Sequence, residues 1–291
     1  MIRARLFART IGGGNMSIFD EPKIDCHTHI FDPVNFPYGE SVAYRPAGQE
    51  LGTVAQLRQV METYGVHHAL LVQPNSGYGP DNSYILDAIR HGEGRFKGIA
   101  IIPNDVSLDD LRKLKDQGIV GAAINPTFDG LDHYRNARAL IEKLAELDMF
   151  ANIQVQDDDL LMFMPWLEEI PVNILIDHCG RPTPGDSLDR PGFRALLNLA
   201  GTGRASIKIS GYAKFSHQPY PFEDVRHQLQ VLIDAFTPHN CIWASDWPFL
   251  RAPQRQDYGP LMALTEQLFP SESDRRAVLW DTPRRLLGFG H

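Results

Sequence analysis

Cysteine is scarce in this chain. Only Cys26, Cys179 and Cys241 occur among its 291 residues. An odd number of widely spaced cysteines does not suit the framework of a small disulfide-rich domain. All three lie in or beside predicted strands, so we expect buried thiols. Cys26 and Cys179 each adjoin a histidine, but strand alternation would turn their side chains away from it, which disfavours a nucleophilic role.

Long apolar runs are also missing. No segment approaches the roughly 20 apolar residues that span a bilayer. The basic start of the chain lacks the apolar stretch of a secretory signal. We therefore expect a cytoplasmic protein that does not insert into membranes. A GGGN segment follows the basic start, so we predict a flexible extension over residues 1–20 and a folded part over residues 21–291.

Positive charge is not in excess. The chain has 28 basic and 36 acidic residues, which gives a formal net charge of −8 at pH 7. This balance argues against a nucleic acid or an acidic membrane as the partner. A small molecule is the expected partner, and assembly into a homo-oligomer is left open.

A glycine-rich phosphate loop, typical of nucleotide-binding open sheets, is absent after the first predicted strand. Instead, eight β-rich segments alternate with amphipathic stretches at a repeat of about 30 residues. This pattern predicts an α/β fold, a single-domain (β/α)₈ TIM barrel, with a doubly wound open sheet as the alternative. The predicted strands are residues 23–31, 67–74, 96–103, 119–126, 150–156, 172–180, 205–212 and 241–249.

Four helices can be predicted with their ends. Residues 53–65 have apolar positions at helical spacing, a threonine to cap the start and a glycine to end the helix. Residues 107–118 begin with serine and acidic residues and end with basic residues and glycine, as the helix dipole favours. Residues 136–148 and 223–236 show the same helical spacing.

Three histidines stand where a barrel would place its chemistry. Alternation puts His27 and His29 on one face at the end of the first predicted strand. His178 ends the sixth strand, before a turn. A single strand histidine is often only a packed core group. Three at strand ends indicate catalytic residues, because active sites of barrels lie at the C-terminal ends of the strands.

The eighth predicted strand leads to Asp246, which precedes Trp247 and Pro248. We predict that Asp246 is the catalytic carboxylate, with a helix N-cap as the alternative. Burial among aromatic side chains would raise the pKa of Asp246 toward values useful for proton transfer.

Two basic residues lie near the predicted mouth of the barrel. Lys208 shares one face of its strand with Ser206 and Ser210, so we expect it to face the lumen, with exposure to solvent as the alternative. Arg181 follows His178 and could bind an anion or a carbonyl group. A surface salt bridge is the alternative for Arg181.

Four segments of the chain occur together: IDCHTHIFDP, QPNSGYGPDN, IDHCGRP and SDWP. Together they resemble the amidohydrolase superfamily, and more narrowly its lactonase-type branch, which includes 2-pyrone-4,6-dicarboxylate hydrolases. The likeness spans residues 23–290. It implies a (β/α)₈ barrel that hydrolyses a ring ester and binds its substrate through Tyr44, Ser76 and Arg181, to which we add Lys208.

Strand four departs from that branch. The resemblance implies an arginine there to hold a substrate carboxylate, but this chain has Ala123. Lys208 or Lys214 could supply the missing positive charge. The departure favours a different, less anionic lactone.

The resemblance leaves the metal open. Members with two metal ions use a bridging lysine or glutamate on strand four and a histidine on strand five, and this chain has neither. One zinc or manganese ion held by His27, His29, His178 and Asp246 is chemically feasible. The branch includes members that work without metal, and we favour no cofactor.

These observations predict a hydrolase that opens a lactone of a small carboxylated or sugar-acid substrate. Asp246 is the expected general base, and His27, His29 and His178 are expected to polarise the carbonyl group. A metal-dependent decarboxylase of a small aromatic or unsaturated acid and a lactone isomerase are the alternatives. A barrel that only binds a ligand is disfavoured, because binding alone does not need these four groups at strand ends.

Overall fold

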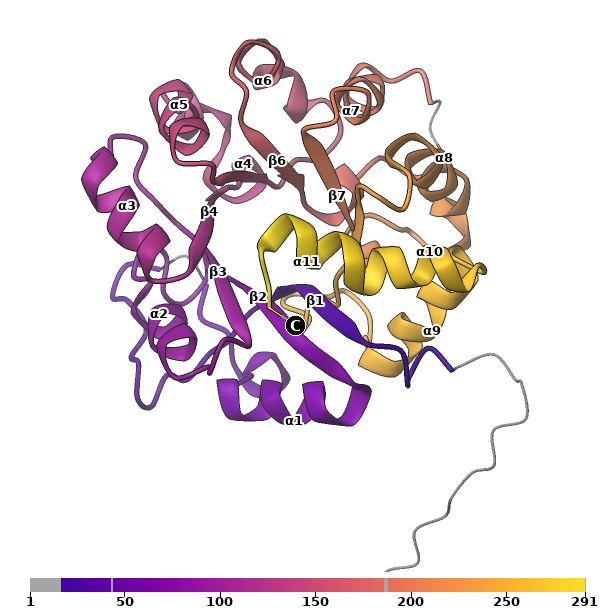
Figure 1. Ribbon diagram of the computed structural model, residues 1–291, viewed down its shortest axis with the longest axis horizontal. Helices are drawn as coiled ribbons and strands as arrows, with labels where there is room; N and C mark the ends of the chain where they lie inside the picture. Colours follow the sequence, from indigo (N-terminus) through magenta and orange to yellow (C-terminus); the bar gives the residue numbers. More distant parts are fainter. Residues whose placement is uncertain (1–16, 43, 186–187, 291) are drawn as a thin grey trace, which may run out of the picture.

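Eight parallel strands form a barrel in sequence order (Figure 1). The computed structural model describes residues 17–42, 44–185 and 188–290. A parallel bridge between Thr28 and Trp247 joins the first strand to the chain beyond the last. The predicted (β/α)₈ barrel is confirmed. The strands are β1 Lys23–Thr28, β2 Val66–Val72, β3 Phe96–Ala100, β4 Ile119–Ile124, β5 Phe150–Ile153, β6 Asn173–Ile176, β7 Ala205–Ile209 and β8 Cys241–Trp243.

Helices follow the strands and surround the barrel (Figure 1). They are α1 Val54–Tyr64, α2 Ser83–Arg90, α3 Leu108–Asp116, α4 Pro126–Asp129, α5 Arg138–Glu146, α6 Met164–Glu169, α7 Pro191–Ala200, α8 Arg226–Phe236, α9 Tyr258–Leu268, α10 Glu272–Arg276 and α11 Thr282–Leu287. The four predicted helices are confirmed as α1, α3, α5 and α8. In α1, Thr53 and Gln56 form a reciprocal capping box and Gly65 ends the helix at φ 66°.

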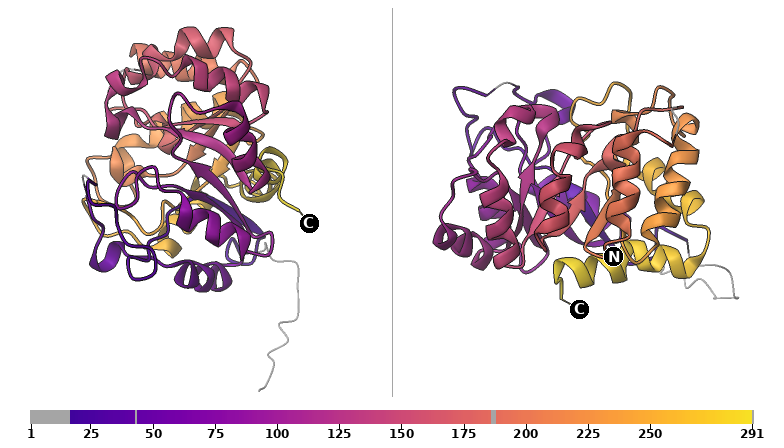
Figure 2. Two further views of the ribbon diagram at one scale, coloured as in Figure 1. Left: turned by 90° about the vertical axis from the view of Figure 1, so that its left-hand side faces the viewer. Right: turned by 90° about the horizontal axis from the view of Figure 1, so that it is seen from above.

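Apolar side chains form two cores. The larger lies between the strands and the surrounding helices. The smaller fills the lumen, where Ile24, Leu70 and Ile242 are fully buried. Trp280 and Leu287, from the C-terminal helices, pack against this lumen core. These helices lie across one end of the barrel in Figures 1 and 2, so that end is closed by apolar packing.

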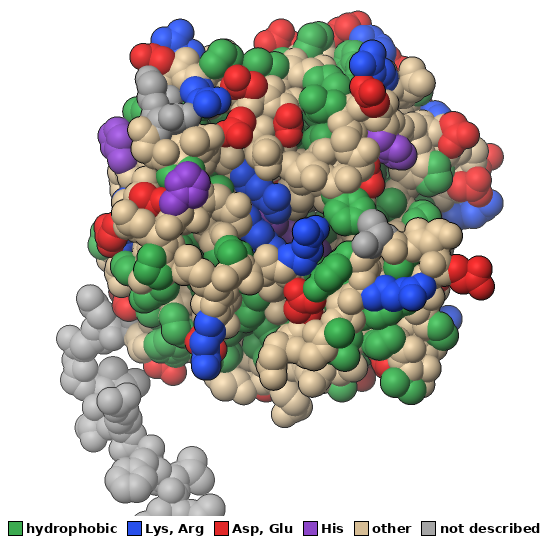
Figure 3. Space-filling view, turned by 180° about the vertical axis from the view of Figure 1, so that it is seen from behind, with side chains coloured by type: hydrophobic (Ala, Val, Ile, Leu, Met, Phe, Trp, Pro, Cys, Tyr) green, Lys and Arg blue, Asp and Glu red, His purple; other side chains and the backbone are tan. Residues whose placement is uncertain are grey.

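The opposite end of the barrel is open. Figure 3 shows this face, where Lys and Arg side chains gather around a central hollow and histidine is visible inside it. The C-terminal ends of the strands meet at this hollow, which is where the chemistry of a barrel is expected.

Ile18 is buried although it belongs to the predicted extension, and Lys23 Nζ donates a hydrogen bond to its carbonyl oxygen at 2.7 Å. Residues 1–16 of that extension lie outside the described part. Cys26, Cys179 and Cys241 are buried free thiols, as predicted. Within the described residues, no helix has the length and apolar character needed to cross a membrane.

Candidate active site

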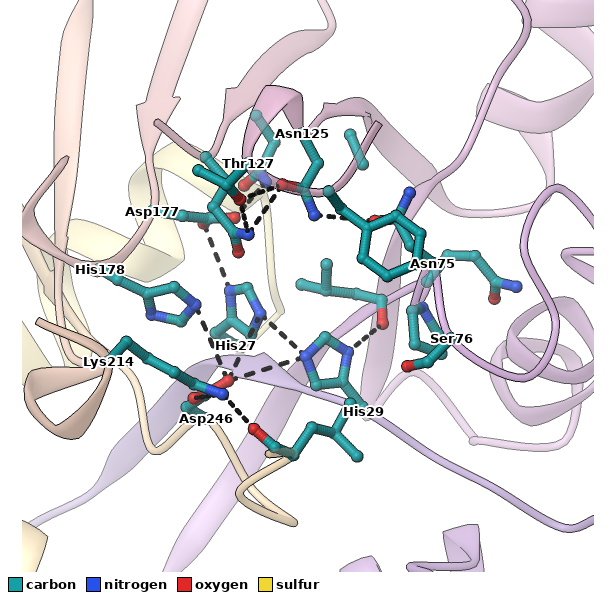
Figure 4. A pocket seen from close by; sticks show the side chains of 18 of the residues that line it. His27, His29, Asn75, Ser76, Asn125, Thr127, Asp177, His178, Lys214 and Asp246 are labelled. Atoms are coloured by element: carbon teal, nitrogen blue, oxygen red, sulfur yellow. Dashed lines mark hydrogen bonds and ion pairs between the residues drawn. The ribbon is translucent and has the colours of Figure 1, made fainter. Parts of the chain in front are cut away.

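A cavity of about 280 Å³ opens at the C-terminal ends of the strands. All four predicted catalytic residues line it, and Figure 4 shows them side by side. The other lining residues come mainly from the loops after β2, β4, β5, β6, β7 and β8. They are Val72, Gln73, Pro74, Asn75, Ser76, Ala123, Ile124, Asn125, Thr127, Phe128, Asn152, Gln154, Asp177, Arg181, Lys214, Leu250 and Arg251.

The first strand brings two histidines into the cavity. His27 belongs to β1 and His29 follows its end, and both are buried. His29 Nδ1 lies 2.7 Å from the carbonyl oxygen of Val72. A carbonyl oxygen only accepts hydrogen bonds, so Nδ1 carries the proton and a neutral His29 presents the lone pair of Nε2 to the cavity. The Nε2 atoms of His27 and His29 are 3.2 Å apart.

His178 reaches the site by a sharp turn. Strand β6 ends at Ile176 instead of running to residue 180, because His178 and Cys179 take positive φ angles of 49° and 58°. His178 Nδ1 lies 3.0 Å from Ser210 Oγ, which leaves Nε2 toward the cavity. Gly211 packs against this ring: a Cβ there would lie 2.4 Å from His178 Nδ1, and its φ is +67°. Only glycine fits at this position.

Asp246 stands between the three imidazoles. Its Oδ1 is 3.9 Å from His27 Nε2, 3.7 Å from His29 Nε2 and 3.8 Å from His178 Nε2. Its Oδ2 is 3.4 Å from Lys214 Nζ. The backbone holds the side chain in place, since Asp246 has a φ of 63° and its N–H donates to the carbonyl oxygen of His27 at 3.0 Å.

The expected rise in the pKa of Asp246 is wrong. Burial alone would raise it, but the positive charge of Lys214 is the largest of the influences that outweigh burial and hold the pKa of Asp246 well below its ordinary value. Burial lowers the pKa of His27 to about 4 and that of His178 well below its usual range. At neutral pH the site therefore contains an ionised carboxylate and a neutral imidazole at His27 and His178.

A buried carboxylate, Asp25, ties β1 to the loop after β8. Its Oδ1 accepts a hydrogen bond from the Ser245 N–H at 2.9 Å, and its Oδ2 accepts one from Tyr258 Oη at 2.8 Å. Burial raises the pKa of Asp25 to about 6. Because Ser245 directly precedes Asp246, these two hydrogen bonds hold the loop that carries Asp246 against the strand that carries His27.

Lys208 faces the lumen, as predicted, but lies behind His27 and is not among the residues that line the cavity. Its Nζ is 2.8 Å from Asp177 Oδ1, 2.7 Å from Asn152 Oδ1 and 3.3 Å from His27 Nδ1. Asp177 Oδ1 also lies 3.3 Å from His27 Nδ1. Burial raises the pKa of Asp177, but Lys208 and His27 outweigh it, so this pKa lies well below its ordinary value.

Of the remaining predicted binding residues, two line the cavity and one does not. Ser76 and Arg181 line the cavity, and within the described residues Arg181 Nε is buried with no hydrogen-bond partner. Tyr44 does not line it; its hydroxyl donates to Glu50, and the guanidinium of Arg251 lies 5.5 Å from its ring centroid.

Comparison with known proteins identifies the family. Residues 24–289 match the family described as amidohydrolase. The chain belongs to the amidohydrolase family. This amidohydrolase is 32% identical to 4-sulfomuconolactone hydrolase from Hydrogenophaga intermedia over 91% of this chain and 88% of the relative. It is 26% identical to D-galactarolactone isomerase from Agrobacterium fabrum over 92% and 91% of the two chains.

A solved structure supports the same grouping. The amidohydrolase superposes with a TM-score of 0.79 on a Pseudomonas putida protein assigned as a 2-pyrone-4,6-dicarboxylic acid hydrolase, with 28% identity over 92% of this chain and 98% of the other. The resemblance to the lactonase-type branch is therefore confirmed, since the relatives are lactone hydrolases and a lactone isomerase.

The site of this amidohydrolase contains groups that could hold a metal ion. His27, His29 and Asp246 offer ligand atoms within 4.8 Å of one another, and His27, Asp177 and His178 form a second such group. The predicted preference for a site without a cofactor stays a prediction.

Three residues in or beside the candidate site of this amidohydrolase were missed in the sequence: Asp25, Asp177 and Arg251. Asp25 and Asp177 each lie near a predicted catalytic histidine, within or just beyond an apolar strand. A carboxylate in such a run needs a buried partner, and this signal could have identified both. Arg251 lies in the loop after β8, where no periodic pattern indicates which way a side chain points.

Proposed function

We propose that this amidohydrolase opens a lactone ring by attack of water, with Asp246 as the general base. One relationship carries the proposal: Asp246 Oδ1 faces the Nε2 atoms of His27, His29 and His178 at 3.7–3.9 Å in a cavity open on one side. A buried carboxylate that stays ionised and reaches a bound water is suited to take its proton.

The chain's own residues supply most of the steps. Asp246 removes a proton from water, and the resulting hydroxide attacks the carbonyl carbon of the lactone. The ring C–O bond then breaks, and protonated Asp246 returns the proton to the leaving oxygen. Arg181 and Ser76, which line the cavity, orient the substrate. Without a bound ion, His178 can donate from Nε2 to the carbonyl oxygen, because its Nδ1 can accept a hydrogen bond from the Ser210 hydroxyl; in the other tautomer, Nδ1 donates to Ser210 and Nε2 is free to bind a metal ion.

One divalent ion fits the same residues. His29 has its Nδ1 proton bound to a carbonyl oxygen, so its neutral Nε2 can accept but cannot donate. His27 Nδ1 lies beside Asp177, an arrangement that orients metal-binding histidines. Lone pairs that converge on a carboxylate suit a cation, and we propose that His27, His29, His178 and Asp246 hold a zinc or manganese ion. Such an ion would act as a Lewis acid on the substrate carbonyl.

Lactone isomerisation is the second candidate, because D-galactarolactone isomerase is a relative. Asp246 could move a proton within the substrate instead of activating water. The decarboxylase alternative gains no support from the relatives described above, and we do not propose it. We retain the expectation of a cytoplasmic enzyme acting on a small molecule.

The experiment combines one substitution with an isotope label. Asp246→Asn should lower kcat on a hydrolysed lactone by about 100-fold or more. Asp234→Asn, at an exposed position of α8, serves as the matched control and should be unaffected. Hydrolysis in ¹⁸O-water places the label in the product carboxylate, whereas isomerisation leaves the product unlabelled. Near-normal turnover of the Asp246 variant would refute the proposed mechanism.

A further inference from the structure

The two sides of the cavity differ in charge. Lys214, Arg251 and Arg181, from the loops after β7, β8 and β6, form what we call the cationic wall. A second surface, which we call the amide wall, is formed by Asn75, Asn125 and Gln154, which follow β2, β4 and β5, and by Thr127 of α4. Figure 4 shows Asn125 and Thr127 across the cavity from Lys214, with His27 between them.

The amide wall is a directed hydrogen-bond chain that begins at a carboxylate. Asp129 Oδ2 accepts a hydrogen bond from Asn75 Nδ2 at 3.0 Å, and a carboxylate oxygen can only accept. The Asn75 amide is thereby oriented, and its Oδ1 accepts from Asn125 Nδ2 at 2.8 Å. Asn125 Oδ1 in turn accepts from Gln154 Nε2 at 2.8 Å. Asp129 thus sets the direction of three successive amides.

The end of this chain offers an acceptor to the cavity. Gln154 Nε2 uses its second N–H to donate to Thr127 Oγ1 at 2.7 Å, so both of its donors are occupied. No described residue donates to Gln154 Oε1, and Asn125 Nδ2 retains one N–H. The wall therefore combines an acceptor with a donor.

This combination discriminates between substituents. A hydroxyl group both donates and accepts, and it can satisfy the Gln154 oxygen and the Asn125 N–H together. A carboxylate or sulfonate only accepts; it would place its charge against the Gln154 oxygen and leave that oxygen without a donor.

We infer that the substrate is a lactone with a single anionic group, bound at the cationic wall, and with hydroxyl groups on its other side, bound by Gln154 and Asn125. This inference rests on the proposed lactonase function and narrows it to hydroxylated, singly charged lactones such as those of sugar acids. A planar lactone with two anionic groups would place its second anion at the amide wall, against the Gln154 oxygen, with no hydrogen-bond donor to offer it.

Three lactones test the inference: glucaro-1,4-lactone (one carboxylate, several hydroxyls), 2-pyrone-4,6-dicarboxylate (two carboxylates) and dihydrocoumarin (neither). We expect the wild-type kcat/KM for the first to exceed that for the second by about 10-fold or more. Gln154→Met should lower kcat/KM for glucaro-1,4-lactone by about 10-fold, mainly through KM, and should lower kcat/KM for dihydrocoumarin, which has no hydroxyl group, by a smaller factor. Gln156→Met, at an exposed position outside the cavity, is the control.

Asp129→Asn tests the directed chain without touching the substrate. Asparagine can donate as well as accept, so the direction of the amides is no longer fixed. The preference for glucaro-1,4-lactone over 2-pyrone-4,6-dicarboxylate should therefore fall. Unchanged selectivity in both the Asp129 and the Gln154 variants would overturn the inference, as would a wild-type preference for the dicarboxylate. If none of the lactones is hydrolysed, the proposed function fails. Calorimetric binding of glucaro-1,4-lactone and 2-pyrone-4,6-dicarboxylate to wild-type protein then still shows whether the site prefers hydroxyl or carboxylate substituents.

Discussion

Lys208 Nζ lies 2.8 Å from Asp177 Oδ1 in the closed interior of the barrel, and both groups contact His27 Nδ1 at 3.3 Å. Two opposite charges are thus placed behind the His27 ring, which lines the cavity. Removing one leaves the other buried and unpaired. We expect Lys208→Met to lower the free energy of unfolding by about 3–5 kcal/mol, as breaking a buried ion pair does. Urea titration measures this change.

A second variant separates stability from positioning. Lys208→Met combined with Asp177→Asn removes both charges, so much of the lost stability should return. Turnover should stay low, because His27 no longer has a carboxylate beside Nδ1 to orient it. Full recovery of kcat in the double variant would show that the pair is only structural.

Gly211 offers a test of how tightly His178 is held. An alanine Cβ at this position would lie 2.4 Å from His178 Nδ1 and should displace the ring. We expect Gly211→Ala to lower kcat by about 100-fold, the effect of a displacement near 1 Å. Gly203 has a similar φ of +69° and nothing within 4 Å of an added Cβ. Gly203→Ala therefore shares the backbone strain and should keep full activity. Equal losses in both variants would contradict the argument.

The pH dependence of kcat/KM tests the charge states of the site. In metal-free enzyme, the proposed mechanism requires ionised Asp246 and neutral His27. As pH falls, His27 with a pKa of about 4 gains a proton before Asp246 does. The rate should stay flat to about pH 5 and decline near pH 4. A decline near pH 6 that persists in Asp25→Asn would instead indicate the raised pKa of Asp246 that the sequence suggested, whereas a decline lost in that variant would report Asp25, whose pKa is about 6.

Acid should also destabilise the metal-free fold through His27. Its pKa is about 4 in the folded state and about 6.5 when unfolded, so the unfolded state binds more protons between these values. The free energy of unfolding should fall as pH drops through this window. In His27→Gln this part of the slope should be absent, which circular dichroism during urea unfolding can measure.

Chelation tests the donor set directly. We expect purified protein to contain about one equivalent of zinc or manganese by elemental analysis. Chelation should lower the melting temperature as well as the activity, because ligand binding stabilises the folded state. His29→Ala should lose the metal while Arg251→Ala retains it. Full activity in protein free of metal would support the cofactor-free site that the sequence favoured.

The sequence predicts the strands of this barrel better than their ends. The alternation of strands and helices needs only local patterns, and the HxH, HCGRP and SDWP segments point to the four groups that meet in the cavity. His178 and Asp246 nevertheless lie beyond their strands in left-handed backbone. Such conformations depend on the tertiary packing around them, so the predicted strands extended past their true C-terminal ends.

The electrostatics of the site were less predictable. The pKa of Asp246 depends on Lys214, which is distant in sequence and arrives from another loop. Lys208 was expected to contact the substrate, but Asp177, just beyond β6, and Asn152, on β5, bind its ammonium group instead. Such contacts between side chains of different strands and loops form only when the barrel closes, and no local sequence pattern indicates them.

The apolar closure beneath the lumen has a consequence for traffic through the enzyme. Trp280 and Leu287 pack against the lumen core below the cavity. The hollow in Figure 3 therefore has a single opening. The ring-opened acid must leave through the same opening by which the lactone enters. Product and substrate exclude each other, so inhibition by the product should be competitive, and the cationic wall that draws the substrate in also delays the more highly charged product.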